Sequence, residues 1–234
     1  MSRKNLPKAR KGSLTPGERF AGTIFFALYL LLLPLAAGPA FSQVERLLGR
    51  QIDGDLQSAL YYYVIFAVTV LIFRRFLVKT SRRFSENSHT ARTTIAIGLA
   101  AMYGLNLLFS SPSPGSLNDS AISSRASGAP LSTLLTVVFL APFVEEVLFR
   151  GFVFGSLKDR NRTGAYAASC LLFALLHVWQ FAVAGRDLSC FLRMPRYFIP
   201  GLVLAWAYDH SGTLWASVVI HAAANALSYL TLLA

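Results

Sequence analysis

Apolar residues in this chain are gathered into long blocks, and short polar or basic stretches separate one block from the next. The blocks cover residues 20–42, 56–78, 93–109, 131–157, 164–184, 197–208 and 213–233. Most approach the length of about 20 residues that an α-helix needs to cross the hydrocarbon of a bilayer. The pattern predicts an all-α fold, a polytopic transmembrane helical bundle with about seven spans.

Two blocks are ambiguous. Residues 197–208 are short for a crossing at about 1.5 Å of rise per residue. They also contain Pro200, which indicates a kinked, tilted or re-entrant helix. The expected number of spans therefore ranges from six to eight. Small residues near Gly38 and Ala40 could imitate a signal-peptide cleavage site, but the apolar run is longer than a typical signal core, which favours an uncleaved helix.

The blocks divide the chain into four parts. Residues 1–19 read as a basic cytoplasmic tail, and residues 20–110 as N-terminal transmembrane helices. Residues 111–130 are rich in Ser, Gly, Pro and Asn, which is typical of a flexible loop. Residues 131–234 form the predicted membrane core.

Composition supports a membrane protein. Hydrophobic residues make up 54% of the chain and charged residues 14%, whereas soluble domains have about 25% charged residues. The net charge of +11 could suit nucleic acid, but the basic residues flank the apolar blocks and lack interleaved stacking aromatics. We therefore expect membrane lipids as partners and no nucleic acid. The two cysteines, Cys170 and Cys190, provide neither a disulfide framework nor a CxxC metal site.

The basic residues also predict an orientation. With a cytoplasmic N-terminus, the tail, the segment after the second block and the segment after the fourth block hold most of the Lys and Arg residues. This distribution follows the positive-inside rule. We expect a multi-pass protein of a bacterial inner or plasma membrane.

Ionisable side chains inside a span are costly unless they are paired or face a wet cavity. The later blocks contain few such polar groups: Glu145, Glu146, Arg150, His177, His221 and the neutral Asn225. Glu146 and Arg150 are four residues apart and can form an ion pair on one helix face. Glu145 points about 100° away. A buried carboxylate without that partner suits proton transfer near neutral pH.

Each histidine shares a helix face with a residue four positions away. His177 lies four residues after Phe173, and His221 lies four residues before Asn225, with small alanines between them that allow close helix packing. Counted at about 1.5 Å per residue from the cytoplasmic ends, Glu145, His177 and His221 lie roughly 18, 20 and 12 Å deep. The sequence thus predicts one shared wet cavity.

These residues resemble the three motifs of a known family. Glu145-Glu146 with Arg150 matches EExxxR, Phe173 with His177 matches FxxxH, and His221 with Asn225 matches HxxxN/D. The family is the membrane-embedded CAAX prenyl endopeptidase type 2 and bacteriocin-processing group (CPBP), also called the abortive-infection family. The resemblance covers roughly residues 131–234.

The resemblance implies an enzyme, a glutamate-type intramembrane protease. Glu145 and His177 would activate water, and His221 and Asn225 would stabilise the oxyanion, a role that both side chains can perform. Arg150 would hold Glu146 and the helix geometry, with Phe173 as structural support.

A metal site is the alternative use of the same residues, because Glu145, His177 and His221 could bind a catalytic zinc ion. The chain has no HExxH motif, and Asn225 is a poor zinc ligand, so we expect no cofactor. Other intramembrane protease classes fit less well. Asp209 has no second intramembrane Asp, and Ser211-Gly212 lacks a full GxSG.

Two non-proteolytic functions remain open. The polar cluster could be the packing core of a membrane binding protein or chaperone, or it could serve an ion or proton transporter. Transport favours broken helices in matching halves, and only the block with Pro200 suggests one. For a protease, we expect a hydrophobic or membrane-anchored peptide substrate, including prenylated or C-terminally anchored ones.

Overall fold

The computed structural model of the chain describes residues 14–109, 122, 126 and 130–233. Within these residues the chain forms helices joined by short turns, with no β-strand. Most of the predicted flexible loop 111–130 and most of the predicted basic tail lie outside the described residues. All seven predicted apolar blocks are helical, which confirms the all-α fold class.

The N-terminal half begins with one long helical rod. It consists of α1 (Pro16–Ala27), a π-helical turn (Leu28–Leu32) and α2 (Leu33–Leu48). The helices α3 (Gly54–Glu86) and α4 (Ser88–Phe109) follow. The rod starts at Pro16 rather than at residue 20 because Thr15 and Glu18 form a capping box, which satisfies two backbone donors at a helix start.

The C-terminal half begins with a continuous helical stretch, residues 130–157, which we call the central helix. It comprises α6 (Pro130–Leu134), a π-helical segment (Leu135–Leu140), α7 (Ala141–Glu145), a second π-helical segment (Glu146–Phe154) and α8 (Gly155–Leu157). The remaining elements are α9 (Arg162–Gly185), a 3-10 turn (Leu188–Arg193), α10 (Pro195–Ser211) and α11 (Leu214–Leu233).

Among the described residues, five helices are long and apolar enough to cross a membrane: Pro16–Leu48, Gly54–Glu86, Leu131–Leu157, Arg162–Gly185 and Leu214–Thr231. The chain is thus a multi-pass membrane protein. The two other predicted spans are helical, as α4 and α10, but they do not meet the same standard of length and hydropathy. The helix α10 has 17 residues and is continuous through Pro200.

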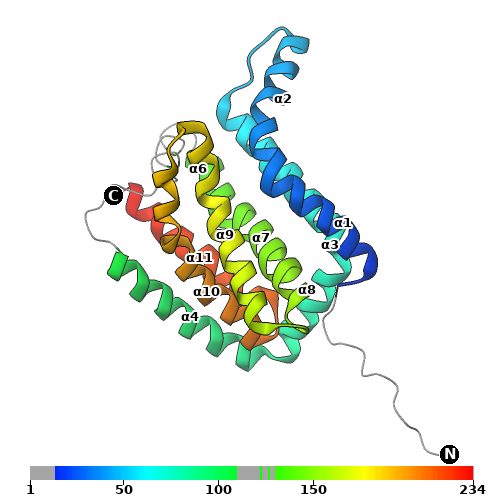
Figure 1. Ribbon diagram of the computed structural model, residues 1–234, viewed down its shortest axis with the longest axis vertical. Coiled ribbons are helices and arrows are strands. Elements are labelled where there is room, and N and C mark those ends of the chain that lie inside the picture. The colour runs from blue at the N-terminus through cyan, green and yellow to red at the C-terminus, as the bar shows by residue number, and fades with distance from the viewer. Residues whose placement is uncertain (1–13, 110–121, 123–125, 127–129, 234) are drawn as a thin grey trace, which may run out of the picture.

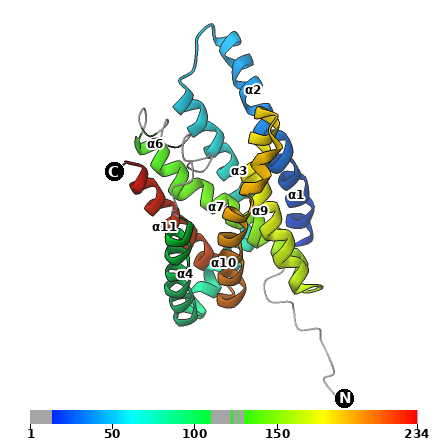
Figure 2. The ribbon, with the colours of Figure 1, turned by 60° about the vertical axis from the view of Figure 1, so that its left-hand side comes forward.

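The central helix lies in the middle of the bundle (Figures 1 and 2), in contact with α1, α3, α9, α10 and α11. Its residues Val147, Leu148 and Phe149 are fully buried on consecutive positions. A helix that is apolar on all sides is expected in the centre of a bundle. In contrast, α2 extends beyond the other helices at one end, and none of its residues is buried.

Close approach of α3 to the central helix depends on a glycine. A Cβ atom at Gly151 would lie 2.7 Å from the Phe76 ring, which is closer than van der Waals contact allows. Small residues serve this purpose in membrane helices generally.

The helix α3 is interrupted at Phe73, where φ is −99° and ψ is 18°. Near this break, the buried carboxylate of Glu18 accepts a hydrogen bond of 2.7 Å from the backbone N–H of Phe76. The same side chain accepts a hydrogen bond of 2.8 Å from the backbone N–H of Thr15. Glu18 therefore satisfies backbone donors of two helices and joins α1 to α3.

A second backbone link joins α3 to α11. The hydroxyl of Thr80 accepts a hydrogen bond of 2.7 Å from the N–H of Leu214, the first residue of α11. Thr213 donates to the carbonyl oxygen of Thr80 over 2.9 Å. The N-terminus of α11 is thus capped by a residue far away in the sequence.

We predict that Glu18→Ala lowers the free energy of unfolding by about 1–3 kcal/mol, because it leaves the buried Phe76 N–H without an acceptor. Unfolding in mixed detergent micelles measures the change. The control is Glu86→Ala, an exposed position at the end of α3, which should change stability by about 0.5 kcal/mol or less. Equal effects of the two substitutions would contradict the capping role of Glu18.

Candidate active site

A fully buried ion pair lies at the centre of the site. The Nη1 atom of Arg150 donates to Oε1 of Glu146 over 2.8 Å, and both side chains have no solvent-exposed surface. Arg150 Nη2 donates to the carbonyl oxygen of Gly201 over 3.0 Å. The guanidinium also lies 4.4 Å from the centre of the Phe173 ring, a cation–π distance. Arg150 therefore connects the central helix to α9 and α10.

Glu146 has a second partner that the sequence did not reveal. Its Oε1 atom lies 2.9 Å from Nδ1 of His221. Because a carboxylate only accepts hydrogen bonds, Nδ1 is the protonated nitrogen of His221. The four-residue spacing predicted the pair with Arg150, but nothing in the sequence indicates which side of α11 faces the central helix.

His177 is held by the residue one turn before it. Its Nδ1 atom lies 2.8 Å from the carbonyl oxygen of Phe173, so Nδ1 is the donor. The ring centroids of His177 and Phe173 are 4.6 Å apart. With Nδ1 engaged, the Nε2 atom of a neutral His177 carries a lone pair, as does Nε2 of a neutral His221.

Glu145 completes the group. Its Oε2 atom lies 3.8 Å from Nε2 of His177 and 3.9 Å from Nε2 of His221, and it is buried without a hydrogen-bond partner. The structure thus brings together Glu145, His177 and His221, which the sequence analysis placed at comparable depths in the membrane. Three acceptors that converge just beyond direct hydrogen-bond distance suit a bridging water molecule or a shared proton.

Asn225 lies one turn beyond His221 on α11. Its Nδ2 atom donates to the carbonyl oxygen of Val137 over 2.9 Å. This bond fixes the amide and uses one of its two N–H groups. The other N–H group and the amide oxygen can still interact with a ligand.

A catalytic zinc ion would need the same side chains at a closer spacing. A tetrahedral zinc ion with bonds of about 2.0–2.1 Å needs donor atoms roughly 3.3 Å apart. The Glu145 oxygen is 3.8 and 3.9 Å from the two imidazole nitrogens. Among the described residues, no group of three His, Cys, Asp or Glu side chains is arranged to hold a metal ion.

Asp209, His89 and His210 lie outside the cluster of Glu145, His177 and His221. Asp209 forms an ion pair of 2.6 Å with Arg162 at the ends of α10 and α9. His89 and His210 are exposed, as expected from their places at helix ends.

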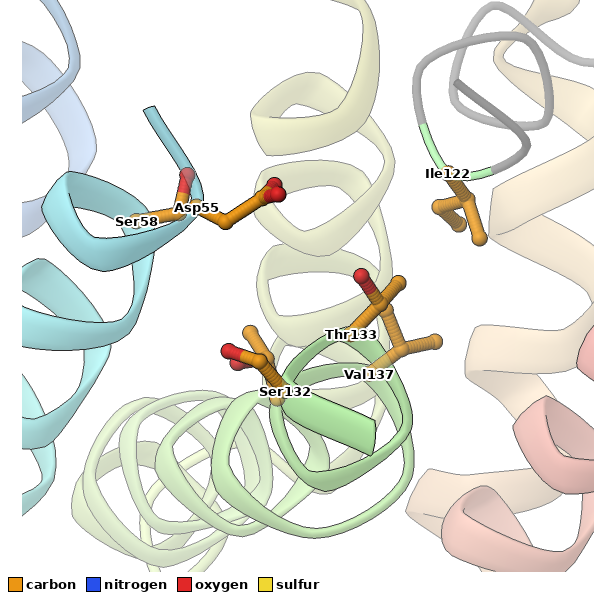
Figure 3. Close-up of a pocket in the computed structure, with 7 residues that line it drawn as sticks. Asp55, Ser58, Ile122, Ser132, Thr133 and Val137 are labelled. Carbon is orange, nitrogen blue, oxygen red and sulfur yellow. The ribbon is translucent and has the colours of Figure 1, made fainter. Parts of the chain in front are cut away.

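A small polar cavity lies nearby, between the N-terminus of α3 and the start of the central helix (Figure 3). Its volume of about 20 Å³ is enough for one water molecule. Asp55 and Ser58 line it from α3, and Thr133 and Val137 from the central helix. The carbonyl oxygen of Val137 is the group that holds Asn225. Glu145 and the histidines do not line this cavity.

Comparison with known families agrees with the motifs. Residues 127–227 match the family model of the type II CAAX prenyl endopeptidase Rce1-like family. We call residues 127–227 the Rce1-like domain after this similarity. It contains all the motif residues from Glu145 to Asn225, so the resemblance inferred from the motifs is confirmed. The helices α1 to α4 lie outside the matched residues.

Two curated relatives are similar over part of their length. The "Uncharacterized 24.3 kDa protein" of Escherichia coli is 34% identical over 98 residues, which are 42% of this chain and 43% of the relative. The "UPF0177 protein YxdF" of Lactococcus lactis subsp. lactis (strain IL1403) is 31% identical over 86 residues, 37% of this chain and 42% of the relative. The matched part of the chain thus spans less than half of either relative. No solved structure matches the chain.

We predict that Arg150→Met in the Rce1-like domain lowers the free energy of unfolding by about 3–5 kcal/mol, because Glu146 then keeps a buried charge without its main partner. The double variant Glu146→Leu/Arg150→Met removes both charges and should recover much of this loss. Unfolding titrations of the two single variants and the double variant measure the coupling energy. A double variant as unstable as the sum of the single variants would contradict a coupled pair.

Proposed function

We propose that this protein is an intramembrane endopeptidase that hydrolyses a peptide bond of a membrane-associated or hydrophobic substrate. The observation that carries the proposal is the convergence of Glu145 Oε2 with the Nε2 atoms of His177 and His221. A buried carboxylate and the oriented neutral imidazole of His177 can hold and deprotonate a water molecule. The similarity of residues 127–227 to the Rce1-like family supports the same chemistry.

In the proposed reaction, a water molecule donates its hydrogens to Glu145 and His177. Glu145 takes one proton as the water oxygen attacks the carbonyl carbon of the substrate. The proton then passes from Glu145 to the leaving amine as the C–N bond breaks. General bases that act in this way typically contribute about 10²–10⁴-fold to the rate.

His221 and Asn225 are the proposed oxyanion donors. Asn225 can use the N–H group that Val137 does not engage. His221 can donate from Nε2 only as an imidazolium, because its Nδ1 proton is engaged by Glu146. The carboxylate of Glu146 offsets the charge of that imidazolium.

The surroundings of the site favour an apolar substrate. The outer surfaces of the surrounding helices carry exposed large apolar side chains, such as Phe139 on the central helix, Leu171 on α9 and Leu230 on α11. A substrate that reaches the site through these surfaces must itself partition into the bilayer. Prenylated and C-terminally anchored peptides belong to this class.

We also propose a bacterial inner or plasma membrane location with a cytoplasmic N-terminus. The second half of α3 supports this orientation, because Arg74, Arg75, Lys79 and Arg82 are all exposed. Such a cluster favours the cytoplasmic side and anionic lipid headgroups.

A binding or chaperone protein is the second candidate function. The buried network of Glu146 and Arg150 with His221 would serve equally well as a packing core. Glu145 separates the two functions, because its Oε2 atom is buried and no described protein group donates a hydrogen bond to it. A packing core gains little from such a group, whereas a general base needs a free acceptor.

The test is cleavage of a peptide library, with and without prenylated members, by the purified protein in detergent. We predict that Glu145→Gln and His177→Ala reduce turnover by about 10²–10⁴-fold while thermal unfolding stays close to wild type. Glu86→Gln, at an exposed position, should retain full activity. A folded wild type that cleaves no peptide would favour the binding protein instead.

Metal dependence is tested in the same assay by treatment with a chelator. We predict unchanged cleavage, because the Glu145 oxygen lies 3.8 and 3.9 Å from the two imidazole nitrogens, farther than the spacing of roughly 3.3 Å between two ligand atoms of a tetrahedral zinc ion. Loss of cleavage that added zinc restores would overturn the metal-free mechanism and assign Glu145, His177 and His221 as zinc ligands.

A further inference from the structure

The imidazole of His177 lies between two aromatic rings. On one side is Phe173, with ring centroids 4.6 Å apart and planes tilted by 48°. On the other side is Tyr197 of α10, also 4.6 Å away but with planes only 24° apart, a stacked arrangement. Aromatic pairs at this distance attract each other beyond the effect of surface burial.

Tyr197 owes its place to the start of α10. This helix begins at Pro195, directly after the 3-10 turn Leu188–Arg193. The backbone N–H of Tyr197 donates to the carbonyl oxygen of Met194 over 3.0 Å. The position of the ring is therefore set by the first turn of a helix rather than by a long loop. None of the three sequence motifs contains Tyr197.

The stack lies at the accessible part of the site. The side chain of His177 is 14% exposed, whereas that of Glu146 is fully buried. Tyr197 is also partly exposed. His177 has one hydrogen bond through Nδ1, but a single bond leaves a partly exposed ring free to tilt about that contact. The second aromatic face restricts this motion.

We propose that Tyr197 is a positioning residue for peptide hydrolysis, which holds the His177 ring so that Nε2 stays directed at Glu145. The π face of Tyr197 also stabilises the positive charge that His177 gains when it shares the proton of the attacking water. This inference rests on the proposed protease function. It adds a residue of α10 to a site that the motifs place on the central helix, α9 and α11.

The inference attributes the effect to the aromatic ring and not to the hydroxyl group or to bulk. Tyr197→Phe keeps the ring and should retain kcat within about twofold. Tyr197→Leu keeps an apolar side chain without a π face. We expect it to lower kcat about tenfold, the effect of losing one cation–π contact in a partly desolvated site, with KM within about twofold of wild type.

The same helix offers a matched control. Trp206 stacks on His210 with centroids 5.2 Å apart and planes 11° apart, away from the cluster of Glu145 and His177. Trp206→Leu removes the aromatic ring that stacks on His210, just as Tyr197→Leu removes the ring that stacks on His177. The Trp206 substitution should leave kcat unchanged. Equal losses in Trp206→Leu and Tyr197→Leu would show that general packing of α10 is responsible, and would overturn the inference.

A readout that does not depend on turnover separates this inference from the proposed function. In protein with ¹³C-labelled histidine, the NMR signal of His177 is identified by its loss in His177→Ala. We expect this signal to carry a ring-current shift that Tyr197→Phe retains, and to move and broaden in Tyr197→Leu. An unchanged His177 signal in Tyr197→Leu would overturn the inference even if the wild type proved inactive. Equal kcat losses in Tyr197→Phe and Tyr197→Leu would also overturn it, because the hydroxyl would then be the active group.

Discussion

The arrangement of the C-terminal half depends on the buried carboxylate of Glu146. A charge without solvent exposure must be paired and hydrogen-bonded, and Glu146 meets this need through Arg150 and His221. Arg150 also donates a hydrogen bond to the carbonyl oxygen of Gly201, and its guanidinium plane packs on the Phe173 ring. One charge therefore determines how the central helix, α9, α10 and α11 face one another.

The same constraint separates two adjacent carboxylates into different roles. Glu146 is engaged by two cationic or donor groups, so it is suited to hold His221 in one tautomer. Glu145, one residue earlier, points to another side of the helix, and its Oε2 atom meets only the Nε2 atoms of His177 and His221. The paired carboxylate of Glu146 thus leaves Glu145 available for the proton transfer that we propose.

Periodicity was sufficient to predict what lies within one helix. The apolar blocks predicted the helices, and four-residue spacing predicted the pair of Glu146 and Arg150. Periodicity does not predict contacts between helices, because these contacts depend on how each helix is rotated about its own axis. The bond from Glu146 to His221 and the stack of Tyr197 on His177 are of this kind. The blocks also predicted α4 and α10 as helices, although these two are not among the five described helices that are long and apolar enough to cross a membrane.

The helices outside the Rce1-like domain are attached to it through backbone groups as well as through apolar packing. Thr80 of α3 accepts from the Leu214 N–H at the start of α11 and so links α3 to this domain. Glu18 in turn joins α1 to α3, because it accepts from the Phe76 N–H one turn before Thr80. His221 lies two turns beyond Leu214 along α11. Because a helix is stiff over that length, the hydrogen bond that fixes its first residue also restrains the imidazole that it carries. The N-terminal half therefore contributes to the geometry of a site to which it supplies no motif residue.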